Sequence, residues 1–203
     1  MVVLPLPYWG DIELFAQLVQ AGSEAVIDLH ENYIKRSQRN RTDIITANGL
    51  MTLSVPLRNA NRPRTPMRDV RIDYSKRWQH QHWMAIVSAY RSSPYFEMVA
   101  DRIARFYERE WHFLVDYNSE ILATEIELLG LEPQFRFSEE YIVWQEGVVD
   151  MRPKKRDTTF VAPLYFQLFS DRMPFIGNPS MLDLLMCEGR DAIATLQRAS
   201  LPR

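Results

Sequence analysis

Side chains able to bind or react gather in one segment, His30–Arg41. Within these twelve residues lie a histidine, a tyrosine, two asparagines and four cations. A solvated basic loop has little need of His, Tyr and Asn, whereas planar guanidinium groups suit bidentate binding of phosphate. We expect anion binding from Lys35, Arg39 and Arg41, orientation of an acceptor by Tyr33 and Asn40, and a possible general base in His30.

A second set of candidates lies on an aromatic helix and just after it. Trp78 and His82 are four residues apart and share a helix face. His82 is the best candidate for a general base, because an unperturbed imidazole titrates near neutrality. Trp78, Tyr90 and Tyr95 could bind the base and the sugar of a ligand. The alternative is an aromatic-rich pair of buried helices, in which these side chains are core.

The third candidate is the turn Pro7–Gly10 before the first helix. A helix N-terminus offers free N–H groups and a positive dipole end to a phosphate, and Gly10 would let the ligand approach. Asp11 and Glu13 oppose an anion there, so a purely structural turn is the alternative. No metal site is expected, because His80 and His82 face different directions and the chain has one cysteine. We predict that one concave pocket contains His30, Asn40, Arg41 and His82.

Charge is distributed unevenly along the chain. Residues 35–77 contain eleven basic and three acidic residues, whereas residues 97–146 contain twelve acids and four arginines. The basic part implies an anionic partner, unless the two parts pair with each other in the fold. An isoelectric point near 6.1 and the acidic second part argue against nucleic acid as that partner.

Strand and helix signals predict how these residues are positioned. Strands at Val2–Leu6 and Ala25–Leu29 flank a helix capped by Asp11 and stopped by Gly22, which makes a βαβ unit. Asn48-Gly49 predicts a hairpin between Thr42–Ala47 and Leu50–Pro56, and 70–72 a short strand. Residues 58–67 form a candidate mobile basic loop or lid.

Helices are expected after residue 75. They span Ser75–Arg91, Ser93–Arg109 and Trp111–Leu129, with caps at Ser75 and Ser93 and a stop at Gly130. Two more helices follow, one capped by Ser180 and one starting at Asp191. Residues 135–149 give no clear assignment, 152–156 form a charged loop, and 165–169 a short strand. The fold class is α/β or α+β, with a small mixed sheet in the N-terminal half and a helical C-terminal half. We expect one domain, 1–203, with a sheet-forming part (about 1–75) and a mainly helical part (76–203).

Length and composition limit the class of protein. The 203 residues are 46% hydrophobic and 25% charged, as in a globular domain. No apolar run is long enough to span a membrane, and the N-terminus lacks the basic start of a signal peptide. With a single cysteine, Cys187, the sequence predicts a cytoplasmic protein.

The chain resembles the WbqC-like family across nearly its whole length. The matching motifs, in order, are Pro7–Gly10, the basic segment Lys35–Arg41 with its Asn-Arg pair, Leu53–Pro56, Trp78 to His82, Tyr90–Phe96, and Ser180–Leu185 followed by Gly189. Two departures stand out: an aromatic residue commonly occupies the place of Gln38, and longer members carry an extra segment with a Ser-Gly motif.

The resemblance implies a role in lipopolysaccharide O-antigen and related surface-glycan biosynthesis. It favours an enzyme, a transferase that modifies a nucleotide-linked sugar by N-acylation or aminoacylation of an amino sugar. No cofactor is implied, and the ligand is a sugar nucleotide or another anionic small molecule. The alternative is a non-catalytic partner of a glycan-assembly complex. Protein partners would be a second copy of the chain or glycan-assembly enzymes.

Overall fold

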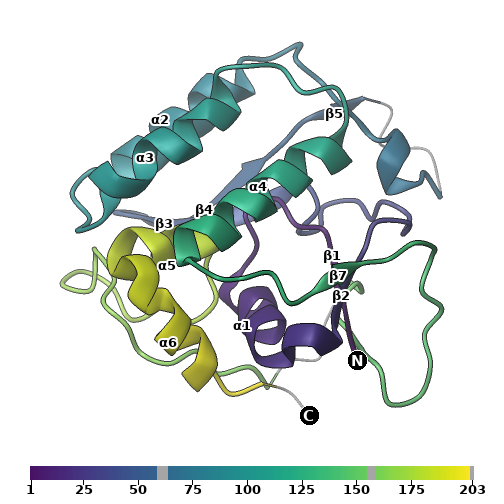
Figure 1. Ribbon diagram of the computed structural model, residues 1–203. Helices are drawn as coiled ribbons and strands as arrows, with labels where there is room; N and C mark the ends of the chain where they lie inside the picture. The colour runs from purple at the N-terminus through teal and green to yellow at the C-terminus, as the bar shows by residue number, and fades with distance from the viewer. Residues whose placement is uncertain (59–63, 155–158, 202–203) are drawn as a thin grey trace.

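The chain begins with the predicted strand–helix–strand unit. A computed structural model describes residues 1–58, 64–154 and 159–201 (Figure 1). The unit consists of β1 (Val2–Pro5), α1 (Ile12–Ala21) and β2 (Ala25–Asp28), and its two strands pair in parallel. Asp11 caps α1 by accepting a hydrogen bond from the N–H of Leu14. Gly22 ends it at a φ of 52°, a conformation that favours glycine.

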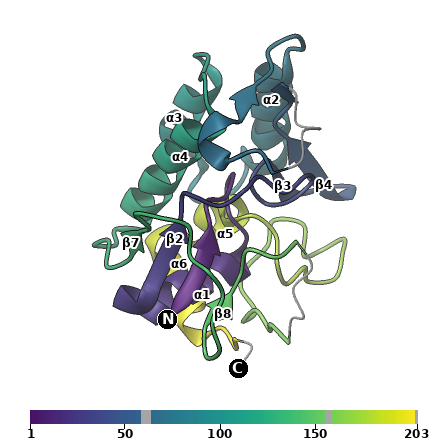
Figure 2. The same ribbon diagram turned by 90° about the vertical axis from the view of Figure 1, so that its right-hand side faces the viewer.

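Two further strands extend this parallel sheet to the order β7-β2-β1-β8. β7 (Arg136–Phe137) and β8 (Val149–Asp150) come from the segment that the sequence left unassigned. Each is two residues long, and each pairs in parallel with its neighbour. Figure 2 shows β2, β1 and β8 side by side at the lower edge of the molecule. The second half of the chain therefore supplies both outer strands of the N-terminal sheet.

The predicted hairpin forms a separate two-stranded sheet. β3 (Arg41–Thr46) and β4 (Gly49–Ser54) pair antiparallel, and Thr46 is opposite Gly49. Ala47 and Asn48 are thus the loop residues, one position earlier than the Asn-Gly pair predicts, and Gly49 adopts a φ of 100°. A third small sheet joins β5 (Leu57–Arg58) to β6 (Arg71–Ile72), which lies within the predicted strand at 70–72.

Three helices pack above the hairpin, and their starts differ from prediction. They are α2 (Trp78–Tyr90), α3 (Phe96–Ala104) and α4 (Leu114–Leu129). Neither predicted serine cap forms: Ser75 binds the Asp73 carboxylate, and the Ser93 hydroxyl donates to the carbonyl of Tyr90. Each helix therefore begins about three residues later than expected. The predicted stop at Gly130 is confirmed, with a φ of 70°.

The C-terminal helices are α5 (Met181–Glu188) and α6 (Ala192–Arg198). The Ser180 cap of α5 is confirmed, since its hydroxyl accepts from the N–H of Leu182. The predicted strand at 165–169 is wrong. Tyr165 instead turns inward and donates a hydrogen bond to the buried Asp183 carboxylate at 2.6 Å, which fixes this stretch as irregular chain.

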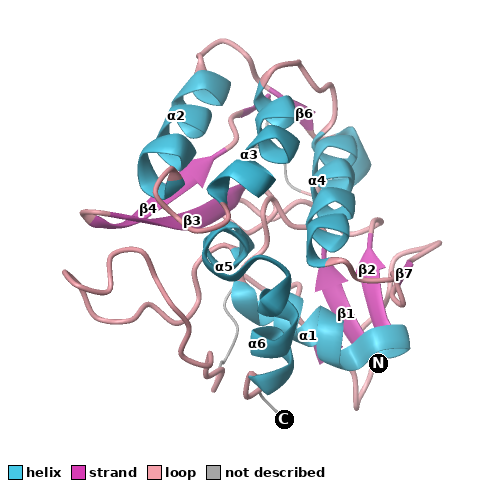
Figure 3. Cartoon of the chain, turned by 60° about the vertical axis from the view of Figure 1, so that its left-hand side comes forward, coloured by secondary structure: helices cyan, strands magenta, loops and turns pink. Residues whose placement is uncertain are grey.

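Two hydrophobic cores hold the elements together. One joins the parallel sheet to α1, α5 and α6, and the other joins the β3–β4 hairpin to α2 and α3. α4 belongs to both: Leu122 and Ile126 enter the first core, Tyr117 and Ile121 the second. Figure 3 shows α2 and α3 over the hairpin, α4 with its lower end above β1 and β2, and α1 beside β1.

This arrangement confirms the expected α/β class, with a small sheet that starts from a βαβ unit and mainly helical structure after it. Of the predicted basic loop at 58–67, residues 59–63 lie outside the described residues. The predicted charged loop at 152–156 is corrected at Arg152, which is buried, and its residues 155 and 156 lie outside the described part.

Candidate functional site

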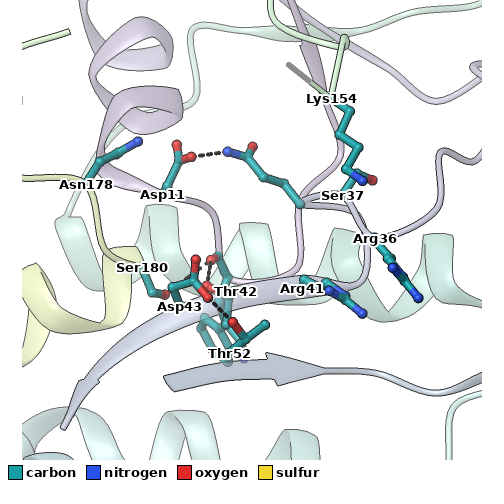
Figure 4. Close-up of a pocket in the computed structure, with 12 residues that line it drawn as sticks. Asp11, Arg36, Ser37, Arg41, Thr42, Asp43, Thr52, Lys154, Asn178 and Ser180 are labelled. Atoms are coloured by element: carbon teal, nitrogen blue, oxygen red, sulfur yellow. Dashed lines mark hydrogen bonds between the residues drawn. The ribbon is translucent and has the colours of Figure 1, made fainter. Parts of the chain in front are cut away.

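A polar pocket of about 270 Å³ lies where four parts of the chain meet (Figure 4). These are the start of α1, the loop before β3, the hairpin and the chain before α5, and a fifth part, the chain after β8, adds Lys154. We call it the Arg41 pocket. It is lined by Trp9, Asp11, Arg36, Ser37, Gln38, Arg41, Thr42, Asp43, Thr52, Lys154, Asn178 and Ser180.

Three cations form one side of the Arg41 pocket. Figure 4 shows Arg36, Arg41 and Lys154 on the same side of it. Among the described residues, none of the three forms an ion pair. The Nε of Arg41 is also buried without a hydrogen-bond partner. Neighbouring positive charges repel each other, so an anion bound between them would be stabilised by all three.

The opposite side carries carboxylates, hydroxyls and amides. Asp43 accepts a hydrogen bond from the Thr52 hydroxyl at 2.5 Å. Asp11 accepts at one oxygen from the N–H of Leu14 and at the other from the amide of Gln38. The second amide atom of Gln38, Oε1, is buried with no partner among the described residues. This side therefore offers acceptors and donors of the kind that bind sugar hydroxyls.

The backbone of Trp9 forms part of the pocket and is strained. Its φ of 44° is in the left-handed region, which costs a non-glycine residue about 1–2 kcal/mol. Its carbonyl accepts hydrogen bonds from the hydroxyls of Thr42 at 2.6 Å and Ser180 at 3.2 Å. The indole is fully buried and donates to the Tyr107 hydroxyl at 2.9 Å. Fixed contacts on both sides thus hold the turn in its strained form.

The N-terminus of α1 has no N–H group to spare for a phosphate in its first turn. The N–H of Ile12 donates to the carbonyl of Pro179, that of Glu13 to the side chain of Asn178, and the next one to Asp11. The free N–H groups expected at this helix start are therefore already paired, two of them with the chain before α5 and one with the Asp11 cap.

Gly10 is required by packing. A Cβ atom at this buried position would lie 2.9 Å from Cε2 of Phe15 and 3.1 Å from Cγ of Pro7. The turn is therefore closed by its own side chains, and a ligand has no access to the Cα of Gly10. The binding role predicted for Gly10 gains no support from this geometry.

His82 is buried in the aromatic core. Its ring Nδ1 is 2.9 Å from the Tyr8 hydroxyl, and it also forms a hydrogen bond with the backbone of Ser54. Burial lowers its pKa from 6.5 to about 4, so the imidazole is neutral at neutral pH. The Tyr8 hydroxyl in turn lies 3.0 Å from that of Tyr107. His82 does not line the Arg41 pocket.

The other predicted members of a common pocket are also elsewhere. Because β1 and β2 are parallel neighbours that end together, Tyr8, Trp9 and His30 all follow the same edge of the sheet. However, His30 is exposed and Asn40 buried, and neither lines the Arg41 pocket. Of the four residues predicted to share one pocket, Arg41 alone lines the Arg41 pocket. The predicted convergence is therefore not found in this pocket.

Tyr33 and Asn40, both predicted to orient an acceptor, do contact each other. The Tyr33 hydroxyl donates to Oδ1 of Asn40 at 2.8 Å, and Nδ2 of Asn40 donates to the carbonyl of Val55 at 3.0 Å. Burial raises the pKa of Tyr33. These hydrogen bonds join the segment His30–Arg41 to the chain that follows the hairpin, which is a structural role. The catalytic roles of Tyr33 and Asn40 stay predictions.

Arg39 is almost completely buried, with 1% of its surface exposed. Its Nε donates to Oε1 of Glu31 at 2.8 Å, and Nη2 pairs with the other carboxylate oxygen. Burial raises the pKa of Glu31 to about 7, outweighing the opposite effect of Arg39. The guanidinium predicted to bind a diphosphate is thus engaged inside the protein, whereas the neighbouring Arg36 and Arg41 face the pocket.

The remaining predicted ligands do not line the Arg41 pocket either. Lys35 is exposed, and Trp78 and Tyr90 belong to the core of the helical layer. The Tyr90 hydroxyl accepts from the N–H of Ile45 at 3.0 Å, which anchors α2 to the hairpin. Tyr95 lines a different pocket. Trp78 and Tyr90 therefore fit the alternative interpretation, in which the aromatic side chains form a buried core.

Sequence reasoning missed most of the pocket. Lys154 and Asn178 join Arg41 only because distant segments meet, and no local pattern marks them. Ser180 was identified, but as a helix cap; its hydroxyl performs that task and also binds the carbonyl of Trp9. In the described parts of the chain, no helix has the length and apolar character needed to span a membrane.

Comparison with known proteins gives one family and one curated relative. The model of the WbqC-like protein family matches residues 6–164. The uncharacterised protein Rv1507c of Mycobacterium tuberculosis is 29% identical over 137 residues, which are 67% of this chain and 57% of the relative. The chain thus covers less than two thirds of that relative's length. No solved structure gives a significant match.

Proposed function

Since the chain belongs to the WbqC-like protein family, we propose that the Arg41 pocket binds the diphosphate of a nucleotide-linked sugar and that the protein transfers a group to that sugar during surface-glycan biosynthesis. The observation that carries this proposal is the cationic side of the pocket. Arg36, Arg41 and Lys154 face it without an ion-pair partner among the described residues. The compartment that we propose is the cytoplasm, in line with the expectation from the sequence.

The two sides of the pocket suit the two parts of such a ligand. Guanidinium groups hold phosphate oxygens through paired hydrogen bonds, and a lysine adds a mobile third charge. The hydroxyls and amides opposite, such as Thr52 and Asn178, can bind the hydroxyls of a sugar. A ligand that spans the pocket would be anchored at its phosphate and presented at its sugar.

Acyl or aminoacyl transfer to an amino sugar needs a base that takes a proton from the attacking amine. His82 does not line the Arg41 pocket, and both oxygens of Asp11 accept hydrogen bonds within the protein. Asp43 is the exposed carboxylate of the pocket. In the proposed reaction the amine nitrogen bonds to the acyl carbon of an activated donor, the donor's leaving group departs with its bonding electrons, and Asp43 receives the amine proton.

Isothermal titration calorimetry with inorganic pyrophosphate and with sugar nucleotides tests the proposal. Arg41→Ala should weaken binding about tenfold or more, since a hydrogen bond to a charged group contributes about 1.5–3 kcal/mol. Arg68→Ala is the matched control, because Arg68 is an exposed arginine of the basic region outside the pocket. No binding by the wild type, or equal binding by Arg41→Ala, would refute the proposal.

One observation favours the alternative role as a non-catalytic partner of a glycan-assembly complex. Several large apolar side chains between residues 137 and 166 are exposed, among them Val143, Trp144 and Leu164. Exposed apolar groups of this kind are typical of protein interfaces. If this role is correct, Trp144→Ser should abolish function in cells while Asp43→Asn leaves it intact.

A further inference from the structure

The third cation of the Arg41 pocket comes from a distant part of the chain. Arg36 and Arg41 belong to the loop and strand after β2, whereas Lys154 follows β8. A lysine side chain is flexible, and the pocket would repel it while no anion is bound. Other contacts must therefore hold the segment that carries Lys154 against the segment His30–Arg41.

Arg152, two residues before Lys154, is fixed by a buried set of ion pairs. Its Nη1 is 2.6 Å from Oδ2 of Asp28, and its Nη2 is 2.7 Å from Oδ2 of Asp150. Nε donates to the second oxygen of Asp150 at 2.9 Å, and Nη1 donates to the carbonyl of Ile142 at 2.6 Å. Every nitrogen of the guanidinium thus has a partner, although 94% of the residue's surface is buried. The backbone at Arg152 is consequently tied to the end of β2.

Arg39 connects the segment that carries Arg152 and Lys154 to its own segment, His30–Arg41. Its Nη2 donates to the backbone carbonyl of Arg152 at 3.1 Å, and its Nη1 donates to the hydroxyl of Ser37 at 3.3 Å. Ser37 itself lines the Arg41 pocket. The ion pair with Glu31 fixes the guanidinium that makes both contacts. Arg39 therefore touches the two segments that supply the pocket with cations, and it does so from the inside of the protein.

The buried cluster lies next to the Arg41 pocket. It consists of three acidic side chains, Asp28, Glu31 and Asp150, around the guanidinium groups of Arg39 and Arg152. A smaller hollow lies between the two segments and is lined by residues of both, including Arg39, Arg152 and Lys154. The cluster and the Arg41 pocket are thus adjacent parts of one structure.

We propose that Arg39 and Arg152 are positioning residues that hold Lys154 beside Arg36 and Arg41, and that the Arg41 pocket binds its anion through this arrangement. The inference rests on the proposed function, because it takes the pocket as an anion site. Neither positioning residue touches the anion. They act by fixing the backbone on each side of the pocket, so their effect on binding passes through Lys154.

A double-mutant cycle on pyrophosphate binding, measured by calorimetry, tests this route. Lys154→Ala should weaken binding about tenfold. Asp150→Asn and Arg152→Lys, which each disturb the hold on residue 152, should weaken it several-fold in the wild-type background. In the Lys154→Ala background the same changes should have almost no effect, because the lysine through which they act is gone. Glu127→Gln, which removes the ion pair to Arg102 at another site, is the matched control.

The outcomes separate this inference from the proposed function. If Asp150→Asn and Arg152→Lys weaken binding by the same factor with and without Lys154, or leave wild-type binding unchanged, the positioning role is refuted while the anion site stands. If the wild type does not bind pyrophosphate at all, both fail. Melting temperatures identify a variant that has lost its fold. Asp150→Asn and Arg152→Lys disturb the cluster differently, so if one of them does not fold, the other still tests the inference.

Discussion

The guanidinium of Arg152 and the carboxylate of Asp28 lie 2.6 Å apart, although 124 residues separate them in the sequence. Asp28 is the last residue of β2, and Arg152 lies two residues after Asp150, the last residue of β8. Asp28 also accepts hydrogen bonds from the Ser138 hydroxyl and from the backbone N–H of His30. This one carboxylate thus joins three segments at the carboxyl edge of the sheet.

Replacing Asp28 by Asn should lower the free energy of unfolding by about 3–5 kcal/mol, because it leaves the buried charge of Arg152 without one of its carboxylates. Urea unfolding measures the change. Asp171→Asn, which breaks the exposed pair to Arg172, should change stability by less than about 0.5 kcal/mol. Equal effects of the two substitutions would contradict this account of Asp28.

His82 should make stability depend on pH. Its pKa is about 4 in the folded protein and about 6.5 when unfolded, so between these values the unfolded state binds the extra proton. The free energy of unfolding therefore falls as the pH drops from 6.5 toward 4, by up to roughly 3 kcal/mol from this group.

Denaturation of the wild type and of His82→Gln at several pH values measures that contribution. The variant should be less stable at pH 7, where it loses the contacts of the ring, but should lose less stability on acidification. His80→Gln is the control, because His80 is exposed on the same helix. A variant with the pH dependence of the wild type would show that His82 does not titrate in this way.

Gly10→Ala should destabilise the protein by about 1–3 kcal/mol, since the added methyl group would lie 2.9 Å from the Phe15 ring. Thermal unfolding detects the change. At Gly177 the nearest atom to an added Cβ is 3.8 Å away, so Gly177→Ala should have little effect. If both variants melt alike, packing does not explain the glycine at position 10.

Asp43→Asn should strengthen pyrophosphate binding by a few-fold, because it removes a negative charge from a pocket that binds an anion. It should also abolish group transfer if Asp43 is the base. Calorimetry in low and high salt measures the first effect, which salt should reduce. Asp69→Asn, an exposed acid outside the pocket, should leave binding unchanged. Weaker binding by Asp43→Asn would argue against the proposed charge distribution.

Local signals predicted the elements that depend on local interactions. The Asp11 cap, the Gly22 and Gly130 stops and the hairpin all follow from neighbouring residues, and all are confirmed. β7 and β8 could not be predicted, since a two-residue strand has no measurable periodicity and exists only through its partners. Serine is a favoured residue type for a helix cap, but the hydroxyl of Ser93 donates to the carbonyl of Tyr90 in the turn before α3.

Part of the candidate site follows from the sequence. The basic segment predicts anion binding, and Arg41 of that segment does line a cationic pocket; the binding of an anion there stays a prediction. Sequence spacing cannot show that Arg39 points inward to Glu31 while Arg41 faces the pocket, because the tertiary fold supplies the partner of each side chain. For the same reason, helical spacing cannot show that His82 contacts Tyr8 in the aromatic core.

The bond from the Ser180 hydroxyl to the Trp9 carbonyl joins residues 171 positions apart. A growing chain on the ribosome therefore carries residues 9–52 of the pocket long before it carries Lys154, Asn178 and Ser180. Contacts of such high sequence separation form late, because closing the intervening chain opposes them. The basic segment must remain soluble during synthesis without its final neighbours, and the ability to bind an anion should be among the last properties that a nascent molecule acquires.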